Sequence, residues 1–360
     1  MRIAIALILA LHGLIHLMGF VKAFRPSAIA RMTRPMAKPA GLIWLLTCLL
    51  LVAGGITYLA KIRLCWLPIG TGMIISQILI VRNWQDAKAG TFVNMLLLPV
   101  TLTSFGVWHF ERQTDQAVAA LLGNYSAHRP ADDPLPPLPS LVQFWLYQTG
   151  ASEKPNIRHV MVRQAGEMKT SPDGAWRRFT ATHRAGYDQP GFVWHARLDA
   201  GPGLHVAIRD QLLNGNGSML AKIQSLIALD QVTGMEIDEA AMQRYLAEMV
   251  WMPSFAASPY IRWEQLDNVR AKATMNYAGK EASVIFTFNA AGMIKKCEAV
   301  RFYYDKSAPA KVPWVVNMDE GSYQSFEGIL VPAKSTITWQ LEQGSYTWLS
   351  MEILDIKTVL

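Results

Sequence analysis

The chain has 360 residues, of which 51% are hydrophobic and only 17% are charged, and its net charge is +7. Residues 1–110 carry ten basic side chains and one acidic side chain, whereas residues 111–360 carry 24 basic and 26 acidic ones. The excess positive charge therefore belongs to the first part, where the basic residues lie between apolar segments, as in membrane proteins. This distribution excludes nucleic acid as a partner, and the length allows two or three domains.

Four apolar stretches follow one another from the amino terminus, at about residues 3–21, 40–59, 64–81 and 91–110. Each approaches the ~20 residues that a helix needs to cross a bilayer. The sequence therefore predicts a membrane helical bundle of four spans over residues 1–110. A cleaved signal peptide is the alternative for the first stretch, but there the basic cluster follows the apolar run instead of preceding it.

The loops between these stretches differ in charge. The first and third loops carry seven basic residues, and the opposite side of the bundle carries four. Because basic loops stay in the cytoplasm, the sequence predicts an extracytoplasmic amino terminus. Four spans then return the chain to the same side, so the C-terminal domain is expected outside the cytoplasm as well.

Two histidines, His12 and His16, lie on one face of the first predicted span. His16, Gln77 and Asn94 fall within about one helical turn of depth, which predicts a membrane polar layer, with His12 nearer the midplane. His109 lies more than ~10 Å from His12 along the bundle, so a haem or metal site is excluded and no cofactor is expected. A structural layer and a proton-linked or small-ligand site both remain open.

A second domain follows a predicted boundary. The stretch TDQAVAALLGNY is helix-like, and HRPADDPLPPLPS is proline-rich and predicts an extended linker. The chain is thus divided into a transmembrane domain (1–110), a helix and proline-rich linker (111–139) and a β-rich extracytoplasmic domain (140–360). A short helix, SLVQFWLYQTG, opens the last of these.

From about residue 157, strand-type segments alternate with turns that contain Gly, Asn or Pro. Several segments, such as STITWQL, alternate apolar and polar residues, and GPGLHV and NGNG are typical of hairpin turns. The prediction is an α+β domain with a large, curved, mostly antiparallel sheet. Two helical insertions are expected, GSMLAKIQSLIAL and DEAAMQRYLAEMVWM, the second with Asp238 as its N-cap.

Several long motifs resemble an uncharacterised bacterial membrane-protein family with four N-terminal spans and a domain of unknown function. They are HGLIHLMGFVKAF, SQILIVRNWQDAKAGT, PGFVWHARLDAGPGLHVAIRDQLLNGNGSML, RYLAEMVWMP and GSYQSFEGILVPAKSTITW. The resemblance covers nearly the whole chain and implies the bacterial inner (cytoplasmic) membrane, but it supplies no catalytic residues. The C-terminal half also resembles lipoprotein-carrier folds of the LolA and LppX type, in which a curved sheet encloses an apolar cavity for acyl chains.

Signatures of catalysis are absent from the sequence. It contains no GxSxG, HExxH, phosphate-loop or dinucleotide motif, so an enzyme is not favoured. His183, His195 and His205 could meet only if their strands are neighbours, and no short-spaced pair supports a zinc site. We expect half-exposed strand histidines and no metal.

One possible ligand site stands out in the soluble domain. Arg244 and Glu248 lie one helical turn apart, either as a solvated ion pair contributing ~0.3–0.5 kcal/mol or with Glu248 at the mouth of a cavity walled by Trp251. Indoles are numerous in this region, and several could line an apolar pocket. The candidate ligand-binding residues are Trp194, Arg244, Glu248, Trp251 and Trp263.

Two functions are compatible with these features. In the first, an integral membrane protein binds an apolar ligand, of lipid or lipoprotein origin, in its extracytoplasmic β-rich domain, with membrane lipid as its other partner. The alternative is an integral-membrane enzyme or transporter with a polar site around His12 and His16. The first predicts an apolar cavity in the soluble domain, and the second predicts bundle residues that are needed for activity but not for abundance.

Overall fold

The computed structural model describes residues 2–29, 33–123, 137–154, 157–303 and 310–359. Most of the predicted proline-rich linker lies outside these residues. Contacts divide the chain into two compact units, Met1–Arg112 with Gln224–Leu226 and Gln113–Ile223 with Ile227–Leu360. Each unit is described separately.

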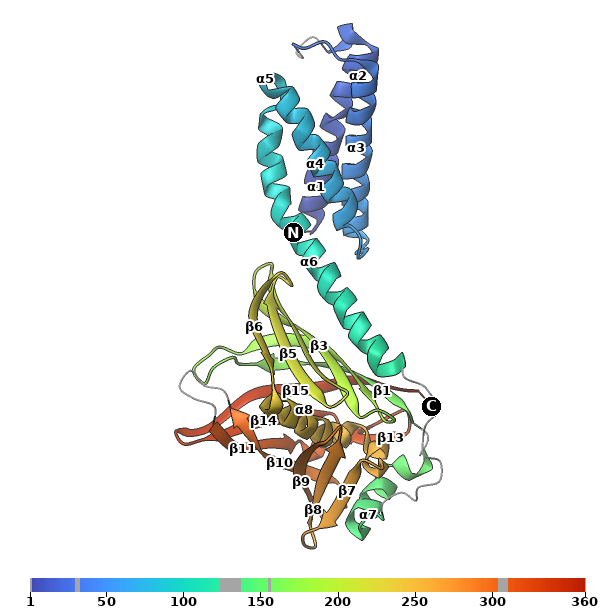
Figure 1. Ribbon diagram of the computed structural model, residues 1–360, viewed down its shortest axis with the longest axis vertical. Coiled ribbons are helices and arrows are strands. Elements are labelled where there is room, and N and C mark those ends of the chain that lie inside the picture. Colours follow the sequence, from blue (N-terminus) through green and yellow to red (C-terminus); the bar gives the residue numbers. More distant parts are fainter. Residues whose placement is uncertain (1, 30–32, 124–136, 155–156, 304–309, 360) are drawn as a thin grey trace. The chain divides into compact units, whose positions relative to one another are not determined.

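The first unit is helical (Figure 1). Its elements are α1 (Arg2–Ile15), α2 (Leu17–Phe24), η1 (Pro26–Ala28), α3 (Lys38–Leu59), α4 (Trp66–Arg82), α5 (Trp84–Ala87) and the beginning of α6 (Ala89–Gly123). Three segments are long and apolar enough to cross a membrane, namely Arg2–Phe24, Lys38–Leu59 and Ala89–Gly123, and α4 is a shorter apolar helix of 17 residues. Three of the four predicted spans thus have the required length and hydropathy, and the fourth stays a prediction.

Helix α6 continues beyond the predicted end of its span. Its 35 residues would extend over about 50 Å, whereas the hydrocarbon core is ~30 Å thick. The stretch predicted as a separate helix after residue 110 is therefore the continuation of α6, as far as Gly123.

Helices α2 and α3 pack closely at Gly19, because glycine has no side chain. A Cβ atom on Gly19 would lie 2.1 Å from the ring of Trp44. Any larger residue at Gly19 would push the two helices apart, so this glycine sets their distance.

The second unit is dominated by a 13-stranded antiparallel sheet in the order β6-β5-β4-β3-β2-β1-β15-β14-β11-β10-β9-β8-β7. Its strands are β1 (His159–Met168), β2 (Arg177–Gly186), β3 (Gly191–Gly201), β4 (Leu204–Leu213), β5 (Asn216–Ile223), β6 (Ile227–Thr233), β7 (Ile261–Gln265), β8 (Arg270–Tyr277), β9 (Lys280–Phe288), β10 (Ile294–Tyr303), β11 (Ala310–Met318), β14 (Lys334–Leu341) and β15 (Gly344–Val359). A separate hairpin consists of β12 (Tyr323–Phe326) and β13 (Ile329–Pro332). The predicted large antiparallel sheet is confirmed.

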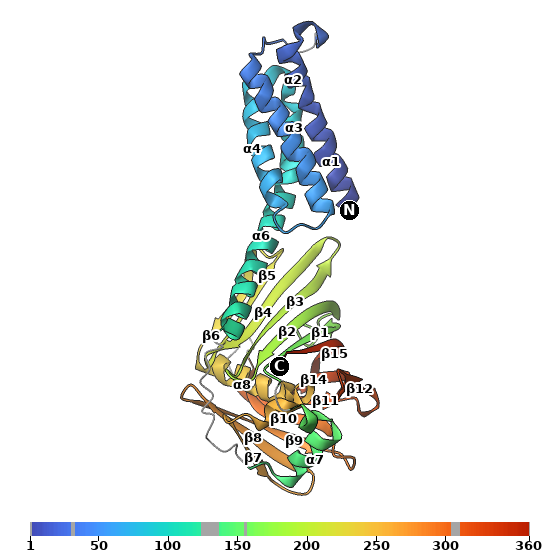
Figure 2. The same ribbon diagram turned by 90° about the vertical axis from the view of Figure 1, so that its right-hand side faces the viewer.

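The sheet is strongly curled, and helix α8 (Met235–Glu248) lies on its concave side (Figures 1 and 2). Buried and exposed residues alternate along strands such as β8, so one face of each strand contributes to the core. Met242, Tyr245 and Leu246 of α8 are fully buried, and the hydroxyl of Tyr245 donates to the carbonyl of Gly186 at 2.9 Å. The helix is thus the centre of the core and not a surface insertion.

Smaller helices complete the unit. The predicted opening helix is present as α7 (Ser140–Gln148), whose Trp145 packs against Trp263 and Phe288. Short 3-10 helices are η2 (Ala151–Glu153), η3 (Met249–Trp251), η4 (Pro253–Ala257) and η5 (Glu320–Ser322).

Two local predictions were wrong. The segment GSMLAKIQSLIAL is not helical but forms β5 and β6, joined by a turn at which Gln224 and Ser225 adopt positive φ angles of 52° and 58°. Asp238 is not the N-cap of α8, because the helix begins three residues earlier at Met235. The Asp238 carboxylate instead accepts from the Gly217 N–H at 2.7 Å and from Lys280 at 2.8 Å, which ties α8 to the sheet.

The close packing of Gly217 against helix α8 predicts the effect of adding a side chain at this position. A Cβ on Gly217 would lie 2.5 Å from the Ile237 carbonyl oxygen and 2.9 Å from the Ala241 Cβ, so Gly217→Val should displace α8 and destabilise the protein by about 1–3 kcal/mol. Thermal unfolding of the full chain measures the loss. Gly123→Ala is the control, because nothing lies within 4 Å of its Cβ position; equal melting temperatures of the two variants would contradict this packing.

Candidate functional site

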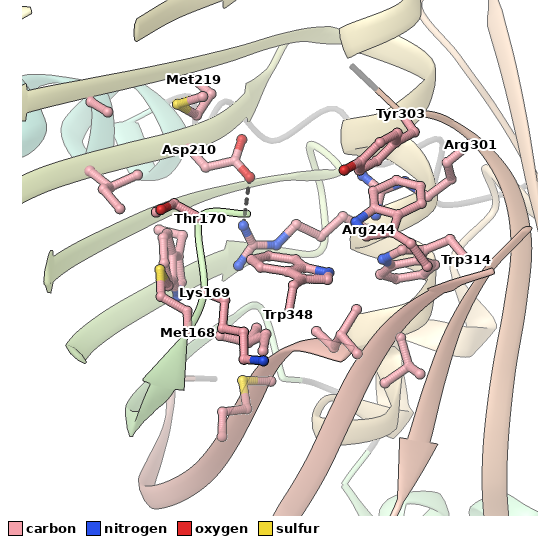
Figure 3. A pocket seen from close by; sticks show the side chains of 18 of the residues that line it. Met168, Lys169, Thr170, Asp210, Met219, Arg244, Arg301, Tyr303, Trp314 and Trp348 are labelled. Carbon is pink, nitrogen blue, oxygen red and sulfur yellow. Dashed lines mark hydrogen bonds and ion pairs between the residues drawn. The ribbon is translucent and has the colours of Figure 1, made fainter. Parts of the chain in front are cut away.

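A cavity of about 580 Å³ lies within the second unit, between α8 and the surrounding strands (Figure 3). This volume is within the ~300–1,000 Å³ usual for small-molecule sites. Its wall is mainly apolar, and its aromatic members are Trp194, Trp251, Phe302, Tyr303, Trp314, Trp339, Tyr346 and Trp348. A ligand here would contact mostly rings and aliphatic side chains.

The register of the sheet explains why aromatic residues gather on one wall. Trp314 of β11 pairs with Trp339 of β14, and Trp339 pairs with Tyr346 of β15. Side chains of directly paired residues project from the same face and contact each other. Three neighbouring strands therefore place three rings in a row on the concave face.

Arg244 of α8 is the centre of a polar cluster in this apolar surrounding. Its Nη1 is 2.5 Å from Asp210 Oδ2 on β4, and its Nε is 2.9 Å from Glu248 Oε1. The guanidinium also lies 4.8 Å from the ring centroid of Trp194. Only 18% of the Arg244 side chain and 7% of the Glu248 side chain are exposed, so the alternative of a solvated surface pair is wrong.

The charges of this cluster depend on one another. Burial alone would lower the pKa of Arg244, but the carboxylates of Glu248 and Asp210 outweigh it and raise that pKa. Burial raises the pKa of Asp210, which the Arg244 guanidinium opposes. Removing Arg244, or one of the carboxylates paired with it, would leave a buried charge without full compensation.

His183 lies beside this cluster as a neutral side chain. Its Nε2 is 3.4 Å from Glu248 Oε2, and its ring stacks on Phe192 with a centroid distance of 5.4 Å. Burial lowers the pKa of His183 to about 4, although the Glu248 carboxylate opposes this effect. His183 therefore contributes no charge at neutral pH.

The three strand histidines do not converge. His183 pairs with Trp194 across β2 and β3, whereas His195 pairs with Thr182, so His183 and His195 project from opposite faces of the sheet. His183 and His205 are 0% and 3% exposed, so the prediction of half-exposed side chains was wrong for both. Within the described ranges, no group of three His, Cys, Asp or Glu residues could hold a metal ion.

Not all of the five residues predicted as a ligand site line the cavity. Trp194, Arg244, Glu248 and Trp251 all line the cavity. Trp263 does not line it, and its indole N–H donates to the Ala256 carbonyl at 2.9 Å. The indole N–H groups of Trp194 and Trp251 are also satisfied, by Gln164 and by the Pro332 carbonyl respectively.

Arg301 of β10 is a wall residue that the sequence did not indicate. Its guanidinium lies 4.3 Å from the ring centroid of Trp314, and its Nη2 donates to the Ala240 carbonyl at 2.9 Å. Burial lowers the pKa of Arg301 to about 10, so it stays charged at neutral pH. Among the described residues, no carboxylate oxygen lies within 4.0 Å of its nitrogens.

Three residues of the predicted polar layer are hydrogen-bonded in the bundle, but the pairing differs from the predicted one. His12 Nε2, not His16, is the partner of Asn94, with 3.0 Å to its Oδ1, and it also lies 3.2 Å from Ser76 Oγ. Asn94 donates to Gln77 Oε1 at 3.0 Å. His16 Nδ1 is 2.9 Å from the carbonyl oxygen of His12 in the preceding turn, and the rings of His12 and His16 lie 4.9 Å apart.

These features define a class of protein: apolar helices of membrane-spanning length joined to a curled antiparallel sheet with an internal cavity. The sequence profile of a family of unknown function, DUF6920, matches residues 136–357, and the chain belongs to this family. A comparison with curated proteins gave no match.

A comparison with solved structures found partial similarity to several proteins. The chain is 10% identical to a LolA superfamily protein from Nitrosomonas europaea, with a TM-score of 0.34, over 61% of this chain and 94% of that one. It is also 10% identical to a DUF1329 family protein from Desulfovibrio piger, with a TM-score of 0.35, over 61% of this chain and 93% of the other.

The buried His183 predicts a pH dependence of stability. Between its folded pKa of about 4 and its unfolded pKa of ~6.5, the unfolded chain binds the additional proton, so stability should fall by about 1–3 kcal/mol as the pH decreases through this window. Melting temperatures of the full chain at pH 7 and pH 5 test this. Burial also lowers the pKa of His195 to about 4, so His183→Gln should reduce the dependence without abolishing it. Parallel curves for the wild type and His183→Gln would contradict the assignment.

Proposed function

We propose that this protein is an integral membrane protein whose β-rich domain binds an apolar, lipid-type ligand outside the cytoplasm. The observation that carries the proposal is the cavity of about 580 Å³, whose wall is mainly apolar. Soluble proteins rarely leave large apolar surfaces uncovered without a functional reason. An apolar hollow of this volume is typical of a small-molecule site, which favours binding as the reason for its presence.

The lining supports an apolar ligand with a small polar part. Rings and aliphatic side chains such as Trp339, Ile337 and Met351 supply most of the wall. Arg244 and Arg301 supply the principal buried polar groups. A few polar groups in an apolar pocket are typical of sites that orient a small molecule.

The proposed location follows from charge and hydropathy. The segments of membrane-spanning length and the basic first and third loops favour a cytoplasmic side for those loops. With α4 as the fourth span, the β-rich domain is extracytoplasmic. Together with the likeness of the sequence motifs to bacterial membrane proteins, this supports the bacterial inner membrane, and it makes membrane lipid an accessible source of ligand.

Filling the cavity should abolish binding. Ala221 of β5 lines it, and Ala221→Trp should reduce the affinity of the full chain, held in an amphipathic polymer, for radiolabelled dioleoylglycerol by at least about tenfold. Ala228→Trp is the matched control, because Ala228 lies on the neighbouring strand β6, is exposed and does not line the cavity. Equal affinities of the two variants, or no binding by the wild type, would refute the proposed function.

One observation favours the alternative of a transporter or membrane enzyme around His12 and His16. In the described part of the bundle, His16 Nε2 and Trp44 Nε1 are buried without a hydrogen-bond partner, and the two rings lie 5.2 Å apart. Buried polar atoms of this kind call for an explanation, and polar groups at membrane depth are functional candidates. A small ligand or a transferred proton would supply the missing partner.

His16→Ala separates this alternative from a structural layer. Among the described residues, the side chain of His16 bonds only to the His12 carbonyl of the preceding turn, so the variant should reach normal abundance. His12→Ala removes the bond to Asn94 and should lower abundance. If the bundle holds the functional site, His16→Ala fails to complement a strain that lacks the gene despite normal abundance in the membrane. Full complementation would exclude the alternative.

A further inference from the structure

We propose that the cavity recognises the uncharged acyl ester groups of its ligand, whose carbonyl oxygens accept hydrogen bonds from Arg301, Trp314 and Trp348. This inference rests on the proposed function and specifies the ligand class. It follows from two properties of the wall: its unused hydrogen-bond donors and its balanced charge.

Three hydrogen-bond donors without a partner lie on strands β10, β11 and β15, which contribute to the wall of the cavity. Among the described residues, Arg301 Nε, Trp314 Nε1 and Trp348 Nε1 are buried and have no hydrogen-bond partner, and all three side chains line the cavity (Figure 3). Trp314 is only 3% exposed. Native proteins satisfy the great majority of such groups, so three of them around one cavity indicate acceptors that the chain itself does not supply.

Among the buried atoms of the described wall, Glu248 Oε2 is an acceptor without a hydrogen bond, and it lies 3.4 Å from the His183 ring nitrogen. The three buried donors without a partner outnumber it. A carbonyl group, which only accepts, matches such a wall better than a hydroxyl group, which would bring a further donor.

The charges at the site favour an uncharged acceptor over an anion. Arg244 and Arg301 balance Asp210 and Glu248, and the two carboxylates act on Arg301 from a distance although neither is paired with it. An anionic head group would add an uncompensated negative charge beside two buried carboxylates, which is costly in an apolar interior. An ester carbonyl satisfies donors without changing the net charge.

The ester carbonyl group of the ligand enters this wall beside Arg301. The three unused nitrogens have almost no exposed surface of their own, so an ester group must enter beside the guanidinium and turn it slightly. Among the described residues, the only hydrogen bond of that guanidinium is the one to the Ala240 carbonyl. The guanidinium lies 4.3 Å from the ring centroid of Trp314, so the two side chains line the same part of the wall.

The test compares two lipids that differ only in their carbonyl groups. The full chain in an amphipathic polymer is titrated with radiolabelled dioleoylglycerol, a diester, and with 1,2-di-O-oleylglycerol, the corresponding diether. We expect the diester to bind about tenfold more tightly or better, because several hydrogen bonds contribute together. Oleate is the third probe and should bind more weakly than the diester.

Variants of the three donor residues test whether their N–H groups cause the preference for the diester. Trp314→Phe and Trp348→Phe keep an aromatic ring but remove the N–H, and each should weaken diester binding about three- to tenfold while leaving diether binding unchanged. Arg301→Lys keeps the charge and removes Nε, and it should likewise weaken binding of the diester. The matched control is Trp263→Phe, because Trp263 does not line the cavity and its N–H already bonds to the Ala256 carbonyl.

The outcomes separate the inference from the proposed function. Equal affinities for diester and diether would overturn the ester site and leave an apolar cavity that binds lipid. Tightest binding of oleate would overturn it in favour of an anion site. Binding of neither glycerolipid would refute both the inference and the function.

The ester groups could belong to a glycerolipid or to a lipid-modified protein. A synthetic diacylated lipopeptide with the same two ester groups, titrated beside dioleoylglycerol, identifies the source that binds more tightly. Sensitivity of either ligand to Trp314→Phe supports the ester site, whereas insensitivity of both overturns it.

Discussion

The ion pairs that Arg244 makes with Asp210 and Glu248 connect helix α8 to strand β4 on the concave face of the sheet. A sheet that curls this strongly must fill its concave face with another element. Helix α8 does so, and it is buried on most sides. A charged residue in that position requires charged partners, so the cluster sets where the helix can lie and therefore where the remaining space is.

That cluster is a costly way to hold a helix. Apolar residues of similar volume often stabilise a core at least as well as a buried ion pair. The second unit has both a buried ion-pair cluster and a cavity beside it. Stability alone does not explain the cluster, whereas the ligand that we propose, with an apolar body and a polar group, would account for both features.

Features that depend on local patterns could be predicted from the sequence: the apolar helices, the succession of strands, helix α8 and the Asn214–Gly215 turn. The β5–β6 hairpin could not, because its apolar residues have helical spacing and its turn uses Gln224 and Ser225 at positive φ without a glycine. The wall of the cavity was predicted only in part. Arg301 and Trp314 meet residues of distant strands through the order of the sheet, which no local pattern encodes, and Trp263 could not be distinguished from the indoles of the wall.

The buried polar groups of the two units differ in how they are used. In the bundle, His12, Asn94 and Gln77 satisfy one another across helices, and this pairing accounts for polar side chains among apolar helices. Among the described residues of the bundle, His16 and Trp44 have one unpaired nitrogen each. At the cavity, by contrast, unpaired donors, a balanced set of charges and a large apolar volume coincide. Because the cavity joins unsatisfied hydrogen bonds to space for a ligand, the β-rich domain carries the stronger argument for function.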